Sequence, residues 1–162
     1  MKTEEKDMNY MLNALDNEKN HRILNKSQHT IKDEKNEILQ KVGINGKYLS
    51  ILHKKLQSYA YISNIHDLNE GSFIRWINLK KAFDYTSRYE HQNTLKMENV
   101  FKLTSGCTIC SIETNKKNPM YGLIRLKNKH MFISIYFQDC IIFQKFTMQE
   151  ELLMYVMKYL SS

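Results

Sequence analysis

The fold of this chain is decided at the stretch Phe73–Leu79, which reads FIRWINL in one-letter code. β-branched and aromatic residues dominate it, and the turn-forming residues 70–72 precede it, so the β part of the chain is predicted to begin here. Similar short segments follow at 100–104, 107–114, 120–127, 130–137 and 140–146, separated by turn-forming residues. Short connections favour antiparallel neighbours. We therefore expect a small antiparallel β barrel of the SH3-like kind, with an oligonucleotide-binding barrel as the alternative.

The end of the chain carries the clearest local signal. Residues 147–150, Thr-Met-Gln-Glu, have the spacing of a capping box that starts a helix. An apolar stripe follows, made of Leu152, Leu153, Val156, Met157 and Leu160. The segments 130–137 and 140–146 are apolar on both faces, with Phe132 and Tyr136 on one face. We therefore expect one face to build the barrel core and the other to receive the carboxy-terminal helix.

The first third of the chain is predicted to be helical. Apolar residues are sparse in residues 4–42, and Leu24, Ile31 and Ile38 stand seven apart with polar residues between them. This weak seam is typical either of a coiled-coil arm or of a solvent-facing helix. Gly43 and Gly46 indicate a turn, and a three-four apolar spacing predicts a second helix over 47–64.

These patterns define an α+β chain with two parts. Residues 1–66 are expected to form a helical arm or α-hairpin, with a coiled coil as one form of it. Residues 67–162 are expected to form the small β-barrel domain with its closing helix. The segment 80–99 has no clean periodicity, so we expect a long loop within the β part.

The composition is that of a folded chain with a diffuse positive charge. The 162 residues are 42% hydrophobic and 25% charged, with a net charge of +7 that is shared between both halves of the chain. No apolar run reaches the ~20 residues of a membrane-spanning helix, and residues 1–10 lack the apolar stretch of a signal peptide. We therefore expect no membrane partner.

The residues that usually carry catalysis show no recognisable arrangement. The six histidines have no metal-binding spacing, no serine stands in a nucleophile elbow, and the five glycines form no phosphate-binding loop. We therefore expect no enzymatic activity, no catalytic residues and no cofactor.

Cys107 and Cys110 match a CxxC spacing, which could supply metal ligands together with Cys140 or His130. Residues three apart on a strand point to opposite faces, however, whereas metal knuckles and redox pairs place both sulfurs on a turn or helix start. We therefore expect reduced structural cysteines and no metal, with a metal knuckle as the alternative.

A set of basic residues with interleaved aromatics is the best binding candidate. Basic side chains can contact phosphates while aromatic rings stack on bases, as in small barrels that bind single strands. The alternative is a solvated surface with Trp76 in the core. The candidate residues are Arg75, Lys80, Lys81, Arg88, Arg125, Lys127 and Lys129.

The stretches 71–79, 102–109 and 141–147 resemble uncharacterised proteins of giant nucleocytoplasmic large DNA viruses of the mimivirus-like groups. The resemblance implies a viral protein with a helical segment before a short β domain and a closing helix. We expect a virion or assembly component, located in the virion or in a virus factory in the host cytoplasm. It would act through self-association or another viral protein, with residues 4–64 as the contact region. A nucleic-acid-binding module is the alternative.

Overall fold

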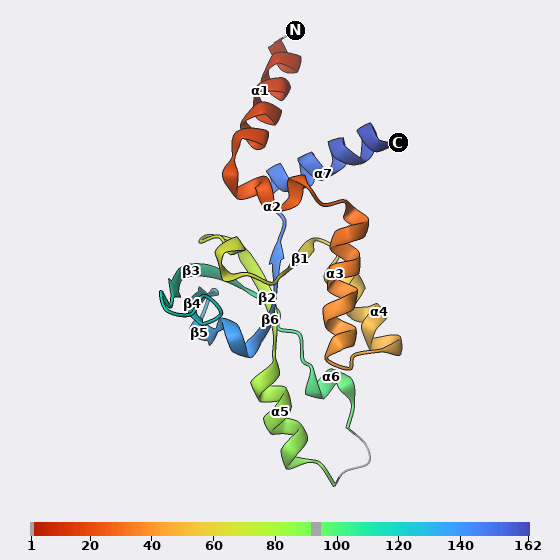
Figure 1. Cartoon of the computed structure of the whole chain (residues 1–162), viewed down its shortest axis with the longest axis vertical. Helices are drawn as coiled ribbons and strands as arrows, with labels where there is room; N and C mark the ends of the chain where they lie inside the picture. The colour runs from red at the N-terminus through yellow and green to blue at the C-terminus, as the bar shows by residue number, and fades with distance from the viewer. Residues whose placement is uncertain (1, 92–94) are drawn as a thin grey trace.

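The computed structural model describes residues 2–91 and 95–162, which form seven α-helices around one six-stranded antiparallel sheet. Figure 1 shows the strands in the middle of the molecule and helices on several sides of them. The strand order is β1-β6-β2-β3-β4-β5. The strands are β1 (Tyr59–Ile62), β2 (Phe73–Asn78), β3 (Cys107–Thr114), β4 (Gly122–Lys127), β5 (Phe132–Tyr136) and β6 (Cys140–Lys145).

The mixed helix-and-sheet class is confirmed, but the closed SH3-like barrel is wrong. Over the described residues the sheet stays open, with β1 at one edge and β5 at the other. Near its start β3 pairs with β2, where Cys107 lies opposite Ile74, and further along it pairs with β4. Gly106 makes the bend before β3 possible, because its φ is 104° and an added Cβ would meet the Phe73 ring. The sheet therefore curls without its edge strands meeting.

The first strand comes from a segment that was predicted to be helical. The helix expected over 47–64 ends early, as α4 (Gly46–Lys55), and residues Tyr59–Ile62 form β1. β1 pairs with β6, so the sheet includes residues on both sides of the expected boundary at residue 66. α4 and the preceding helix α3 (Gln28–Lys41) pack over this part of the sheet, where Leu39, Leu52 and Phe143 share one apolar core.

The long loop expected over 80–99 is also wrong in part. The Asn78 side chain caps the helix α5 (Leu79–Arg88) by accepting a hydrogen bond from the Lys81 amide. A short helix α6 (Met97–Val100) follows, and residues 92–94 lie outside the described residues. The strand expected over 100–104 is reduced to a single bridge between Leu103 and Ile77.

The amino-terminal helices are several short pieces. They are α1 (Lys2–Asp16), the 3-10 turn η1 (Glu18–Asn20) and α2 (His21–Leu24), before α3 and α4. Leu24 ends α2, whereas Ile31 and Ile38 lie on α3, so the seven-residue repeat does not run along one helix. Ile31 and Leu39 of α3 are buried within this chain. α1 projects from one end of the molecule (Figure 1).

The carboxy-terminal helix α7 (Met148–Ser161) begins with the predicted capping box. The Thr147 hydroxyl accepts from the Glu150 amide at 3.2 Å, and the Glu150 carboxylate accepts from the Thr147 amide at 2.9 Å. Its position differs from the expectation, because α7 packs on α1 and α2. Leu153 and Met154 share a core with Ala14, Ile23 and Phe146. The sheet face with Phe132 and Tyr136 is therefore left exposed.

Candidate binding surfaces

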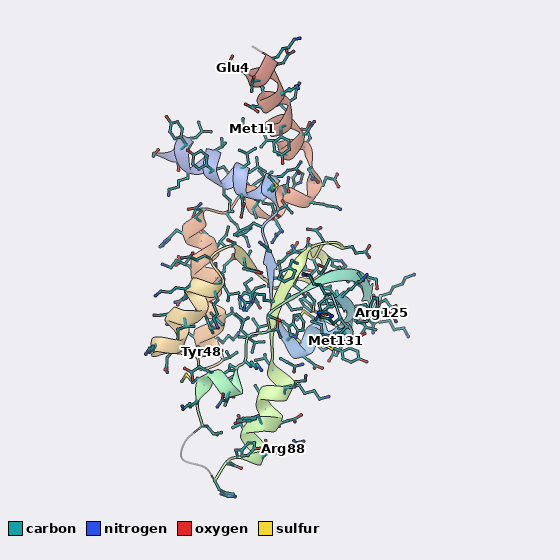
Figure 2. The ribbon with its side chains drawn as sticks, turned by 180° about the vertical axis from the view of Figure 1, so that it is seen from behind. Glu4, Met11, Tyr48, Arg88, Arg125 and Met131 are labelled. Atoms are coloured by element: carbon teal, nitrogen blue, oxygen red, sulfur yellow. The ribbon has the colours of Figure 1, made fainter. Side chains whose placement is uncertain are left out.

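The seven predicted basic residues do not form one surface. Arg75 has a structural role, since its Nε donates to the Thr104 carbonyl at 2.8 Å and one terminal nitrogen donates to the Lys55 carbonyl at 3.3 Å. Lys80, Lys81 and Arg88 lie on α5. Arg125 and Lys127 lie on β4, and Lys129 lies in the turn before β5. Figure 2 shows Arg88 at the far end of α5 and Arg125 on the strands, well apart from each other.

Two of these basic residues lie among exposed aromatic rings. The register places Lys127 opposite Phe132, Arg125 opposite Ser134, and Leu123 opposite Tyr136. The side chains of one strand alternate between faces, so these residues share one face of the sheet, here called the β4–β5 face. Phe132 is 79% exposed and Tyr136 is 54% exposed. The Lys127 Nζ lies 5.5 Å from the centre of the Phe132 ring, a cation–π contact.

Sequence reasoning missed Phe132 and Tyr136 as surface residues, because apolar residues on both faces of a segment usually mean that both faces are covered. The sequence predicted Trp76 in the core as the alternative to a stacking surface, and this is confirmed, since Trp76 is buried with Ile74 and Leu126.

The β4–β5 face also carries an acidic neighbour. Arg125 lies 3.2 Å from the Glu113 carboxylate, which reduces the net positive charge of the β4–β5 face.

A groove runs beside the edge strand β5, and it is called the β5 groove below. Its volume is about 600 Å³. The lining residues come from β2, α5, the segment 99–107, the turn after β4, and β5 with the residues next to it. They include Trp76, Lys81, Lys102, Cys107, Ile133 and Ile135.

The cysteines are placed as the strand geometry predicts. Cys107 is buried, whereas Cys110, three residues along β3, is exposed. Burial, with a smaller effect of the neighbouring Asp139 carboxylate, raises the pKa of the Cys140 thiol to about 12. Burial also raises the pKa of Cys107. These two thiols are therefore protonated near neutral pH and are poor nucleophiles. Within the described residues, no group of three or more His, Cys, Asp and Glu side chains is placed to hold a metal ion.

The third surface lies on the projecting helices and is called the helical surface. On α7, Met148, Leu152, Tyr155 and Tyr159 follow a four-three-four spacing and lie on one side. This side is turned away from buried Leu153 and Met154, and Tyr155 and Tyr159 are 68% and 76% exposed. On α1, Met8, Leu12 and Leu15 form a second exposed apolar stripe. No helix in the described ranges is both long and apolar enough to cross a membrane.

Comparison with known proteins adds no assignment to these three surfaces. No protein-family model matches the chain, and neither the curated proteins nor the solved structures gave a match.

Proposed function

We propose that this chain is a non-enzymatic binding protein that works as a structural component of an assembly. It associates with a second copy of itself through the helical surface. In line with the sequence resemblance, the assembly is a virion, or a virus factory in the host cytoplasm, of a giant DNA virus. The observation that carries the proposal is that α7 is apolar on two sides and only one side is covered. A helix that is apolar all round is normally buried, so the open side of α7 needs a partner.

The distribution of charge favours a second copy as this partner. α1 carries four acidic and two basic residues, and α7 carries Glu151 and Lys158 besides Glu150, which is buried in an ion pair with Arg22, so these helices together present −2. The whole chain has a net charge of +7, which leaves +9 for the rest of the molecule once the Arg22–Glu150 pair is set aside. The acidic helices of one copy are therefore attracted to the basic body of another.

Light scattering after size-exclusion chromatography tests this proposal. The full chain is expected to run as a dimer or larger species, since pairing buries the tyrosines and the stripe on α1. The double variant Tyr155→Ser, Tyr159→Ser is expected to be a monomer. Phe83→Ser is the matched control, because Phe83 is 73% exposed on α5, away from the helical surface. A wild-type chain that is monomeric at every accessible concentration would contradict the proposal.

A specific observation favours a second function, the binding of single-stranded nucleic acid at the β4–β5 face. Lys127 lies over the Phe132 ring, and Arg125 and Tyr136 flank them on the same face. Exposed aromatic rings beside cationic groups can stack on bases and contact phosphates.

This second function predicts salt-dependent binding of a fluorescent oligothymidine, measured by anisotropy. Changing Arg125, Lys127 and Lys129 together to Ala should weaken binding. It should also make the slope of log K against log salt concentration less steep, by the equivalent of up to about three lost phosphate contacts. The control changes Lys116 and Lys117 to Ala, since these exposed lysines lie in the β3–β4 turn. Binding that is absent, or independent of salt, would exclude this function.

A further inference from the structure

The edge strand β5 is unusual for an exposed sheet edge. The run Met131–Phe137 reads MFISIYF, with no charged residue, no proline and no glycine. β5 pairs with β4 along one side and ends the sheet on the other side. An edge strand presents a row of backbone donors and acceptors to any added strand, so natural proteins usually protect such edges with lysine, proline or a bulge. β5 has none of these devices in its five residues.

The β5 groove lies along this edge. Residues that point to alternate faces of β5 all line it, namely Ile133 and Ser134, then Ile135 and Tyr136. Side chains from both faces meet only where the backbone edge itself forms the wall. The far wall is the segment from Asn99 to Cys107, which the structure fixes to β2, because the Thr104 amide donates to the Trp76 carbonyl at 3.1 Å. The groove is therefore bounded by a strand edge on one side and by a fixed polar segment on the other.

The lining determines which side chains the groove would accept. Trp76 and Cys107 contribute apolar surface on the same side as Ile133 and Ile135, with which they share one core. Two basic residues, Lys81 and Lys102, also line the groove, whereas Asp139 is the one acidic residue in its lining. The groove thus combines an apolar floor with a net positive wall, within a chain of net charge +7.

We propose that the β5 groove binds an extended peptide segment of a partner protein, which adds to β5 as a seventh strand. Alternate side chains of the peptide are aliphatic and face the apolar floor. At least one of the others is acidic and pairs with Lys81 or Lys102. This is the strand-addition mode, in which backbone hydrogen bonds supply affinity and alternate side chains supply specificity. The proposal concerns a different surface from the helical surface, and it is independent of self-association.

A single extended segment suits the groove better than the sheet edge of a second copy. A second copy would bring its own β4 along with its β5, and the fixed segment 99–107 occupies the far side of the groove. A peptide brings no second strand, and its outer edge would meet the polar residues Asn99, Thr104 and Ser105. A dimer through β5 is therefore the competing outcome that the experiment must detect.

The chain contains one tryptophan, Trp76, and it lines the groove, so its fluorescence reports binding directly. The probe is the peptide acetyl-Glu-Val-Glu-Val-Glu-Val-amide, titrated into the full chain. Saturable change in Trp76 fluorescence is expected, together with slower hydrogen exchange of β5 backbone amides. The peptide with Lys in place of each Glu should bind at least roughly tenfold more weakly. A peptide methylated on alternate backbone nitrogens should not bind, because it cannot complete the strand pairing.

Matched variants separate the groove from general charge. Lys81→Glu should weaken binding of the acidic peptide roughly tenfold, whereas Lys80→Glu, at an exposed residue outside the groove lining, should leave it unchanged. The variant Tyr155→Ser, Tyr159→Ser should keep full peptide binding, so failure of this proposal is distinguishable from failure of self-association. Three results would overturn the proposal: no saturable binding, equal binding of the methylated peptide, or β5 amides already protected by dimerisation without peptide.

Discussion

Among individual residues, Lys35 is a lysine that is buried in the folded chain. It lies in the middle of α3 and is only 4% exposed, and its Nζ donates to the Leu56 carbonyl at 2.7 Å. Burial, together with the nearby positive charge of Lys32, lowers the pKa of Lys35 from 10.5 to about 8. Burial of the His53 ring, together with the positive charges of Lys35 and Lys32, lowers the pKa of His53. The folded chain therefore holds a buried ammonium group at neutral pH at a cost in stability.

This cost predicts that Lys35 contributes a rise in stability with pH. Between pH 8 and 10.5 the unfolded chain keeps the Lys35 proton while the folded chain loses it, so Lys35 adds to the free energy of unfolding at most about 1.4 kcal/mol per pH unit. The Cys107 and Cys140 thiols, whose pKa values are raised in the folded chain, contribute a decrease over the same range, so the Lys35 contribution is the difference in slope between the chain and a variant that lacks Lys35. Lys35→Met should remove this rise, whereas Lys41→Met, at an exposed residue at the end of α3, should keep it. Urea unfolding at a series of pH values between about 8 and 9.5 measures the difference. An equally steep rise in the Lys35→Met variant would rule out Lys35 as its source.

At the scale of elements, sequence predicted those whose ends carry chemical signals. The capping box at Thr147 fixed the start of α7, and turn-forming residues separated β3 from β4 and β4 from β5. β1 was missed because Tyr59–Ile62 is four residues long and mostly buried, so its apolar pattern fits either a helix or a strand. α5 was missed because its helical start depends on the Asn78 cap directly after a strand, within a lysine-rich segment.

The arrangement of elements was harder to predict than the elements themselves. Alternating strands with short turns fit both a closed barrel and an open curled sheet, and closure depends on where the edge strands end in space. The candidate site shows the same limit. Arg125 and Lys127 were found by residue type, but only the register of β4 with β5 shows that Phe132 and Tyr136 lie beside them. The β5 groove depends on a segment far from β5 in the sequence, so no local pattern indicates it.

For the whole molecule, one buried ion pair joins the two ends of the chain. Arg22 of α2 donates from Nε and a terminal nitrogen to the two carboxylate oxygens of Glu150, at 2.8 and 2.9 Å. Glu150 is fully buried, and it also caps the first turn of α7. Asn17 and Asn20 add hydrogen bonds to Gln149 at 2.9 and 3.1 Å. These contacts hold α7 against the amino-terminal helices, and the strand β6 leads directly into α7.

This geometry predicts that the helices and the sheet unfold together. Arg22→Ala leaves the Glu150 carboxylate buried without its main partner, so it should lower the free energy of unfolding by about 3–5 kcal/mol. Lys26→Ala is the matched control, because its ion pair with Glu34 is half-exposed and is worth about 1 kcal/mol or less. Urea unfolding is followed by far-UV circular dichroism for the helices and by Trp76 fluorescence for the sheet. Both transitions should shift together in Arg22→Ala. If only the dichroism transition moved, the helices held together by Arg22 and Glu150 and the sheet would be separately stable units.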